Sequence, residues 1–227
     1  MNESAFVKQL QQLFENDGFL AQREVSVGYG IADLVLVKKN KVNSKHCRIR
    51  KNNRQLSPLL SEEYFKTLKC LPDENNQKKP VEFKYLAEKS NLSKSYLRYQ
   101  ILRKLEKFGY IKRVGENHYF KVNGWLPIAK ELIAIEAKLK NWKRGAIQAN
   151  RYRAFAHRVY LAIPKETEHL VNLSFLKEHG IGLIVLDTKN EQKRIILQSQ
   201  AITPIDEYKF NYATEYFWSK KQLVNFA

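Results

Sequence analysis

The segment Ile133-Ala134-Ile135-Glu136-Ala137-Lys138-Leu139 combines an apolar run with two opposite charges, Glu136 and Lys138, set two residues apart. On a β-strand, side chains at i and i+2 point to the same face, so a strand here would present a carboxylate and an ammonium group side by side. Strands this apolar are usually central in a sheet, where a buried charge needs a partner or a metal. The segment is therefore either a surface strand with an ordinary ion pair or the centre of a functional site.

The composition narrows the class of partner. The 227 residues suffice for one large domain or two small ones, and a hydrophobic content of 44% can form a core. Forty Lys and Arg against 23 Asp and Glu give a net charge of +17, which points first to nucleic acid and next to an anionic membrane surface. We expect no membrane association, because no apolar run can span a bilayer and the basic residues are interleaved with folded segments.

The cysteines and the N-terminus indicate a cellular compartment. Cys47 and Cys70 have no metal-ligand spacing and do not form the framework of a secreted disulfide protein. The first residues, Met1-Asn2-Glu3-Ser4, lack the basic-then-apolar pattern of a signal peptide. The sequence thus predicts inert thiols in a cytoplasmic protein.

The N-terminal part predicts a helix and a β-hairpin. Residues 3–16 have apolar residues at helical spacing, and residues 23–27 and 31–37 read as strands around the turn Gly28-Tyr29-Gly30. Asp33 lies inside the second, strongly apolar strand, where an acid needs a partner. The alternative is an aspartate near a turn that bonds to backbone amides. Residues 38–54 follow with eight basic residues and no acid, which is typical of a solvated linker and marks a domain boundary.

Residues 57–123 predict a self-contained unit. Helices are expected over 62–71 and 81–89, with a polar loop at 75–79 between them, and Ser93 can cap a third helix that runs to Phe108. Two short strands, 110–114 and 118–122, complete a pattern that resembles a winged helix-turn-helix domain. In that family the third helix enters the DNA major groove. The alternative is a winged helix that contacts proteins. The candidate DNA-binding residues are Lys94, Ser95, Tyr96, Tyr99, Arg103, Lys112 and Arg113.

From Gly124 onward the pattern alternates between strands and helices. A basic loop is expected at 140–145, and a helix over 146–157 carries Gln148 and Tyr152 on one face. A strand over 159–163, a helix over 168–179 and a strand over 181–186 then imply an α/β sheet with right-handed crossovers. Residues 192–198 can add an edge strand, and residues 208–226 an aromatic C-terminal helix.

Taken together, Gly30-x-x-Asp33, Glu136-x-Lys138 and Gln148-x-x-x-Tyr152 resemble the PD-(D/E)xK nuclease superfamily, and the last of these looks most like the branch with RecB-type and CRISPR-associated exonucleases. The resemblance implies a restriction-endonuclease-like mixed sheet flanked by helices. It covers residues 1–38 and 124–190, so we expect the nuclease core in 1–54 and 124–227 and an inserted winged helix in 55–123. Ala32 stands where the family name has Pro, and no glutamate of the first helix fits the exonuclease spacing, although Glu3 could support a metal site.

The resemblance also implies roles for the site residues. Asp33, Glu136 and the carbonyl of Ala137 would hold Mg²⁺ (or Mn²⁺), because hard cations prefer oxygen ligands. Lys138 would orient or deprotonate the attacking water, Gln148 would hold Lys138, the water or the phosphate, and Tyr152 would contact a backbone phosphate.

These roles predict a magnesium-dependent deoxyribonuclease that acts on double-stranded DNA. The alternative is a non-catalytic DNA-binding regulator or replication factor on a nuclease-like scaffold. A second copy of the chain or another protein is a further partner that the sequence leaves open.

Overall fold

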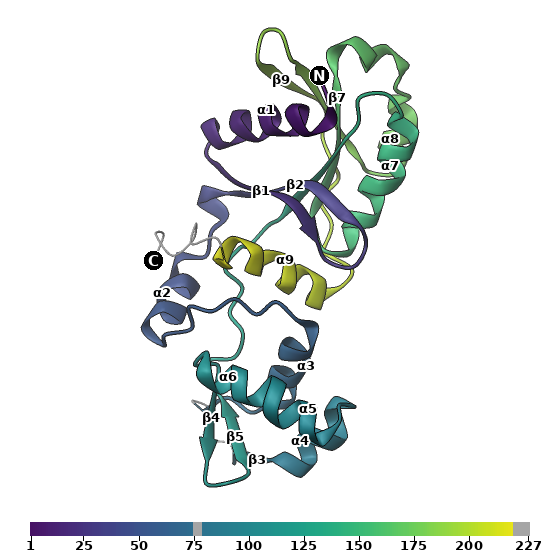
Figure 1. Ribbon diagram of the computed structural model, residues 1–227. Coiled ribbons are helices and arrows are strands. Elements are labelled where there is room, and N and C mark those ends of the chain that lie inside the picture. Colours follow the sequence, from purple (N-terminus) through teal and green to yellow (C-terminus); the bar gives the residue numbers. More distant parts are fainter. Residues whose placement is uncertain (75–78, 220–227) are drawn as a thin grey trace. The chain divides into compact units, whose positions relative to one another are not determined.

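The apolar segment around Ile135 forms strand β6 (Ile133–Ala137), which lies inside a six-stranded sheet with the order β1-β2-β6-β7-β8-β9 (Figure 1). In the computed structural model, which describes residues 1–74 and 79–219, this sheet is the centre of unit 1, formed by Met1–Val42 and Ala129–Ala213. The remaining strands are β1 (Phe19–Ser26), β2 (Ile31–Lys38), β7 (Arg158–Pro164), β8 (Gly182–Asp187) and β9 (Gln192–Leu197).

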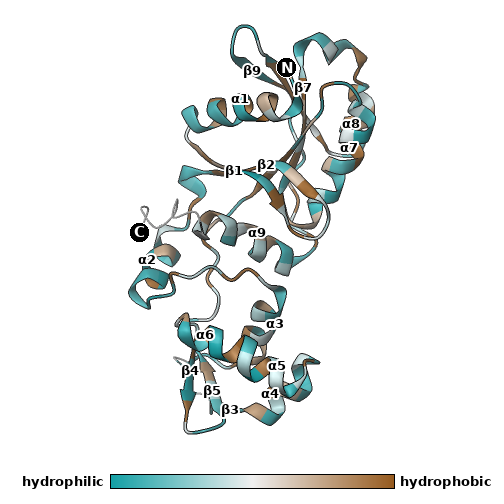
Figure 2. Ribbon diagram, in the orientation of Figure 1, coloured by the Kyte–Doolittle hydropathy of each residue, from teal (hydrophilic) through white to brown (hydrophobic). Residues whose placement is uncertain are grey.

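The strand directions make the sheet mixed. β1 and β2 form an antiparallel hairpin, and β2 is antiparallel to β6. β6, β7 and β8 are parallel, and β9 returns antiparallel to β8 at the edge. The strand β2 is hydrophobic over most of its length, whereas the ribbon of α1 is largely hydrophilic (Figure 2). The predicted α/β class, with a mixed sheet flanked by helices, is confirmed.

Helices cover both faces of this sheet (Figure 1). On one face, α1 (Glu3–Asn16) buries Phe6, Leu10 and Phe14 in a core shared with β2, β6, β7 and β8. The opposite face carries α7 (Trp142–Arg151) and α8 (Leu173–Glu178). The shorter helical segments of unit 1 are η1 (Lys39–Lys41), η4 (Tyr152–Ala154) and η5 (Lys165–Leu170).

Unit 2 contains Asn43–Ile128 and, at the C-terminal end of the described part, residues 214–219. It contains a three-stranded sheet with the order β3-β5-β4. Helix α9 (Glu207–Ser219) starts in unit 1 and ends in unit 2. The other elements are α2 (Ser44–Asn52), α3 (Glu62–Cys70), β3 (Val81–Glu82), α4 (Phe83–Ser90), α5 (Lys94–Tyr96), the π-helix η3 (Leu97–Leu102), α6 (Arg103–Lys107), β4 (Ile111–Val114) and β5 (His118–Lys121).

The expected third helix of residues 57–123 is present as the run α5, η3 and α6. Ser93 caps it as predicted, because its side chain accepts the Tyr96 backbone N–H. Leu97, Ile101 and Leu105 are buried on one side. The middle of the run is a π-helix, in which the Arg103 N–H bonds to the carbonyl of Arg98 five residues earlier.

The expectation of a solvated linker over residues 38–54 is wrong. The segment contains η1 and the helix α2, and Arg50 within it is fully buried. The Asn43 side chain starts α2 by accepting the His46 N–H. The compact units accordingly divide at Val42 and Asn43 rather than after residue 54, and at Ile128 and Ala129 rather than after residue 123. Of the described residues, 214–219 belong to unit 2 and not to the unit that contains β6.

Several element boundaries also differ from the sequence prediction. Helix α7 begins at Trp142, inside the expected basic loop, and the expected helix over 81–89 starts with the short strand β3. The expected helix over 168–179 is divided into η5 and α8. Residues 75–78 of the predicted loop and 220–226 of the predicted C-terminal helix lie outside the described residues. Among the described helices, none is both long and apolar enough to cross a membrane.

Candidate active site

Asp33 and Glu136 meet on neighbouring strands. The β2–β6 register pairs Leu34 with Ile135, so its continuation by one residue places Asp33 opposite Glu136. Directly opposed residues share one face of a sheet. The Asp33 Oδ2 accepts the backbone N–H of Ala137, 104 residues further along the chain, at 2.8 Å. Asp33 therefore bonds to a backbone amide of β6 and not to one of its own turn.

Glu136 is a buried carboxylate with a partner on each oxygen. Its residue is 1% exposed. Oε1 lies 2.9 Å from the Lys138 Nζ, and Oε2 accepts the Tyr152 hydroxyl at 2.5 Å. The spacing of two residues at the end of β6 brings Glu136 and Lys138 together as predicted, whereas Tyr152 reaches Glu136 from η4.

Lys138 lies between two glutamates and against helix α7. Its Nζ is also 3.5 Å from the Glu3 Oε2 at the start of α1, so Glu3 reaches the site through Lys138. A Cβ on Gly145 would lie 2.7 Å from the Lys138 Cγ and 2.7 Å from the Leu161 Cδ1, closer than real Cβ contacts. Glycine at position 145 thus allows α7 to pass close to Lys138 and β7.

Gln148 follows Gly145 by three residues on α7 and faces the same region. It lines a cavity of about 480 Å³ together with Glu3, Lys138, Asn141 and Arg144. Its Oε1 is buried and has no hydrogen-bond partner within the described part of the chain. A buried polar atom is normally satisfied, so this amide can bind a water molecule, or a phosphate oxygen with its O and N positions exchanged.

Both carboxyl groups have a raised pKa in this partly dry site. Burial raises the pKa of Asp33, and the charges of Glu3 and Glu24 raise it further. The hydrogen bond from the Ala137 N–H and the charge of Lys138 lower it, but by less. Burial also raises the pKa of Glu136, and the Asp33 charge adds to it, although the bonds from Tyr152 and Lys138 oppose the shift. A cation between the two groups would relieve both effects.

Lys138 remains an ammonium group in this arrangement. Burial alone lowers its pKa, but the hydrogen bond and charge of Glu136, with the charges of Asp33 and Glu3, outweigh burial and raise the pKa. Deprotonation of a water by Lys138 would require a depressed pKa, whereas the contacts of the site without a cation raise it. The geometry favours a role in orienting a water molecule over a role as its base.

Tyr152 is fully enclosed, with an exposed fraction of 1%. Its hydroxyl lies 2.7 Å from the Ile31 carbonyl as well as 2.5 Å from Glu136, and burial with the Glu136 bond raises its pKa. The expected contact of Tyr152 with a DNA phosphate is contradicted by this burial. Tyr152 instead holds the Glu136 carboxylate in place.

The donor set suits a hard divalent cation. Asp33 uses Oδ2 for the Ala137 N–H, which leaves Oδ1 to bind a cation. The N–H and C=O of one strand residue point to the same side, so the Ala137 carbonyl faces the side of Asp33. Among the described residues no group of three or more His, Cys, Asp or Glu side chains is placed to hold a metal. Water and substrate oxygens would complete the coordination, as they usually do for Mg²⁺.

The predicted DNA-binding residues lie on the surface of unit 2. Lys94, Ser95, Tyr96, Tyr99 and Arg103 are exposed. Lys112 and Arg113 are exposed too, and they pair with Glu74 at 2.6 Å and Glu106 at 3.8 Å.

Arg98 is the residue that the sequence reasoning missed in this region. It lines a groove of about 340 Å³ with Tyr99, Arg103 and Arg113. The π-helical bond between Arg98 and Arg103 places both in one turn, whereas α-helical spacing separates them. The basic side chain was visible in the sequence, but its alignment with Arg103 was not.

No family model matches the sequence, and neither a curated protein nor a solved structure matches the chain. A functional conclusion must therefore come from the residues at the two sites. In unit 1 these are paired carboxylates with a lysine and an unsatisfied amide, and in unit 2 an exposed basic groove.

Proposed function

We propose that the chain is a Mg²⁺- or Mn²⁺-dependent nuclease that hydrolyses phosphodiester bonds of double-stranded DNA. The observation that carries the proposal is the convergence of Asp33 on β2 with Glu136 on β6 and Lys138 directly after it, from segments 104 residues apart. A structural ion pair needs only Glu136 and Lys138. The half-buried carboxylate of Asp33 places a second negative charge beside this pair. Two neighbouring carboxylates of this kind are the arrangement that a divalent cation binds.

The residues have distinct roles in this proposal. A bound divalent cation supplies charge neutralisation at the phosphate and a more acidic water. Asp33, Glu136 and the Ala137 carbonyl hold the cation, and Tyr152 fixes the Glu136 carboxylate. The Lys138 ammonium orients the attacking water and attracts the phosphate. Gln148, with its unsatisfied amide, holds that water or a phosphate oxygen.

Unit 2 is the duplex-binding part in the same proposal, as a winged helix inserted in a restriction-endonuclease-like core. The run α5–η3–α6 followed by the β4–β5 hairpin supports this proposal, as does the exposed face of Tyr96, Tyr99 and Arg103. Arginine side chains bind phosphates and guanine edges. The net charge of +17 agrees with a polyanionic partner.

A plasmid-cleavage assay tests the reaction. The wild-type chain should nick or linearise DNA with Mg²⁺ and not with EDTA. Glu136→Gln should lower the rate at least about 100-fold, the scale of a lost catalytic interaction. Glu166→Gln is the matched control, because Glu166 is exposed on η5 and the change is the same. Equal cleavage by wild type and Glu136→Gln would contradict the assignment.

The second candidate function is a DNA-binding protein without catalysis. It is favoured by one observation, that both oxygens of Glu136 already have protein partners. In that case the wild-type chain would bind duplex DNA with Mg²⁺ present and leave it intact. Binding and cleavage measured on the same preparation separate the two functions.

A further inference from the structure

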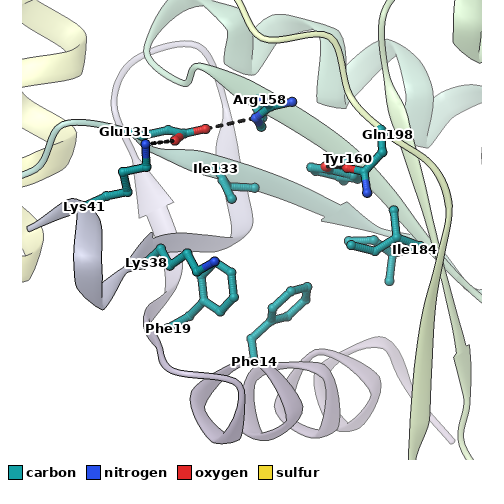
Figure 3. Close-up of a pocket in the computed structure, with 11 residues that line it drawn as sticks. Phe14, Phe19, Lys38, Lys41, Glu131, Ile133, Arg158, Tyr160, Ile184 and Gln198 are labelled. Carbon is teal, nitrogen blue, oxygen red and sulfur yellow. Dashed lines mark hydrogen bonds and ion pairs between the residues drawn. The ribbon is translucent and has the colours of Figure 1, made fainter.

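Helix α1 covers only part of one face of the unit 1 sheet and leaves a pocket beside its C-terminal end. The last buried residue of α1 is Phe14, and the helix ends at Asn16. Next to Phe14 lies a pocket of about 350 Å³, with Ile133, Tyr160 and Ile184 on the sheet side (Figure 3). Ligand sites of small molecules start at about this volume.

Glycine at position 182 shapes the floor of this pocket. A Cβ on Gly182 would lie 2.3 Å from the Tyr160 Cδ1, so the Tyr160 ring occupies the space above β8 that any other residue would fill. The Tyr160 hydroxyl donates to the Gln198 Oε1 at 2.9 Å. The Tyr160 ring is thus held by its packing over Gly182 and by its hydroxyl bond to Gln198. The NH₂ group of Gln198 remains as a donor at the rim of the pocket.

Aromatic rings from three elements surround the space. The Phe14 ring from α1 and the Phe19 ring from β1 contact each other edge to face, with centroids 5.3 Å apart. Tyr160 from β7 contributes the third ring (Figure 3). Aromatic walls favour a planar ligand, because rings stack with each other beyond the gain from buried area.

The mouth of the pocket is cationic. Glu131, the acid that lines it, is bound by the Arg158 Nε at 2.9 Å and lies 3.8 Å from the Lys41 Nζ. Lys38 lies opposite Phe19 in the hairpin register and therefore projects to the same face. Within the described residues no carboxylate lies within ion-pair distance of Lys38. Two lysines and an arginine against one acid leave a net positive charge for an anionic group.

We propose that this pocket binds a nucleotide, with the base between the aromatic rings and the phosphate at Lys38 and Lys41. A planar ring with hydrogen-bonding edges and an anionic group matches the three rings, the Gln198 donor and the lysines together, whereas a fatty acid would not use the rings or the rim donor. The source is either a free mononucleotide or the terminal nucleotide of a nucleic-acid strand.

The pocket is separate from the carboxylate site. Ile133 and Glu136 are three residues apart on β6, so their side chains lie on opposite faces of the sheet. Nucleotide binding here does not depend on the proposed cleavage reaction. Glu136→Gln should bind nucleotide as the wild type does, so failure of one proposal is distinguishable from failure of the other.

Calorimetric titration of the full chain in EDTA tests the proposal, with nucleoside monophosphates, the matching nucleosides, inorganic phosphate and octanoate as probes. The monophosphates should bind more tightly than any other probe. Lys38→Gln should weaken their binding about 3- to 10-fold, the scale of one partly exposed charge contact with a phosphate. Lys39→Gln should not, because this neighbouring exposed lysine does not line the pocket.

A blocking variant makes the test independent of charge. Ile195 lines the pocket and is 45% exposed, so Ile195→Trp can fill the pocket without entering the core. It should abolish nucleotide binding while the melting temperature stays near that of the wild type. A single-stranded oligonucleotide titrated into Ile195→Trp and wild type identifies the source: a difference indicates a strand end, and no difference a free nucleotide. Undiminished mononucleotide binding by Ile195→Trp, or tighter binding of octanoate, would overturn the proposal.

Discussion

The Tyr152 hydroxyl has one proton and two acceptors beside it, the Ile31 carbonyl and the Glu136 Oε2. Tyr152 is the donor in both contacts, so the two acceptors share one proton. Burial raises the pKa of Glu136, although the bond from Tyr152 opposes this shift. A divalent cation bound beside Glu136 should therefore lower the pKa of this carboxyl group.

This proton affinity predicts how stability depends on pH. Asp33 and Glu136 both have a raised pKa in the folded chain, so their stabilising contribution is complete below their ordinary values of 3.8 and 4.5 and is lost as pH rises through the folded-state values. In EDTA at neutral pH, Asp33→Asn and Glu136→Gln should melt above the wild type, by roughly 2–4 °C per kcal/mol relieved. The difference should shrink as pH falls toward the ordinary values. Thermal melts across pH measure it, and variants that melt below the wild type at neutral pH would contradict it.

Arg50 in unit 2 is a buried charge that contributes to the stability of that unit. Its guanidinium bonds to both oxygens of Glu215, at 2.6 and 3.0 Å, and lies 4.5 Å from the centre of the Trp218 ring. Burial alone lowers the pKa of Arg50, but Glu215 outweighs it and raises the pKa. Glu215 also accepts the Trp125 indole N–H and the Leu59 backbone N–H. The ion pair therefore joins α2, α9 and the segments around residues 59 and 125.

Loss of one partner should leave an uncompensated buried charge. Arg50→Met should lower the free energy of unfolding by about 3–5 kcal/mol, the usual effect of breaking a buried pair. Arg48→Met is the matched control, because Arg48 is exposed on the same helix and should change stability by less than about 0.5 kcal/mol. Urea unfolding followed by tryptophan fluorescence measures both variants. Equal effects of the two substitutions would show that the Arg50 pair is not a stabilising contact.

At the scale of single elements, helix α7 shows why local sequence patterns mislead. Residues 140–145 contain three basic residues and end in glycine, which reads as a loop. The helix nevertheless starts at Trp142, because the Asn141 side chain caps it by accepting the Arg144 N–H at 3.1 Å. Gly145 lies inside the helix for a tertiary reason, since any larger residue would collide with Lys138 and Leu161. Only the packed structure supplies this reason.

The π-helix η3 adds a prediction about DNA binding at the same scale. Arg98→Gln and Arg103→Gln should each weaken duplex binding and reduce the slope of log K against log salt by about 0.9, the value for one phosphate contact. Lys107→Gln is the control, because Lys107 is exposed on α6 and does not line the arginine groove. Fluorescence anisotropy at several salt concentrations measures all three. If Lys107→Gln changed the slope as much as Arg98→Gln, the groove would have no special role.

At the scale of the whole molecule, the sequence predicted those features for which the local pattern and the tertiary contacts agree. The apolar run around Ile135 predicted the central strand, and the i, i+2 spacing predicted that Glu136 meets Lys138. The sequence also indicated Asp33, since an acid in an apolar strand needs a partner. It could not reveal that Arg50 is buried, because its partner Glu215 is 165 residues away. It could not assign Tyr152, since a tyrosine on a helix face gives no sign of whether it is buried.

The unit boundaries predict where the chain can be shortened. Val42 and Ala129 form an antiparallel β-bridge, so residues 42 and 129 can be joined by a short linker. A chain of 1–42 linked to 129–213 should unfold cooperatively and keep the Asp33, Glu136 and Lys138 site. Excision of 57–123 instead removes Tyr110 and leaves Arg50, Glu215 and Trp218 without part of their packing. Thermal and urea melts compare the two shortened chains. A more stable fold of the chain without 57–123 would contradict these boundaries.

The separation of β2 from β6 along the chain also has a consequence for the time at which the carboxylate site is formed. Asp33 is synthesised 104 residues before its partner Ala137, which corresponds to roughly 5–20 s at the usual rate of translation. During that interval the hairpin β1–β2 has an unpaired edge and Asp33 has no second carboxylate beside it. Ribosome-bound chains that end before residue 129 should therefore neither bind a divalent cation nor cut nucleic acid. The order of synthesis thus delays formation of the carboxylate site at least until β6 has been made.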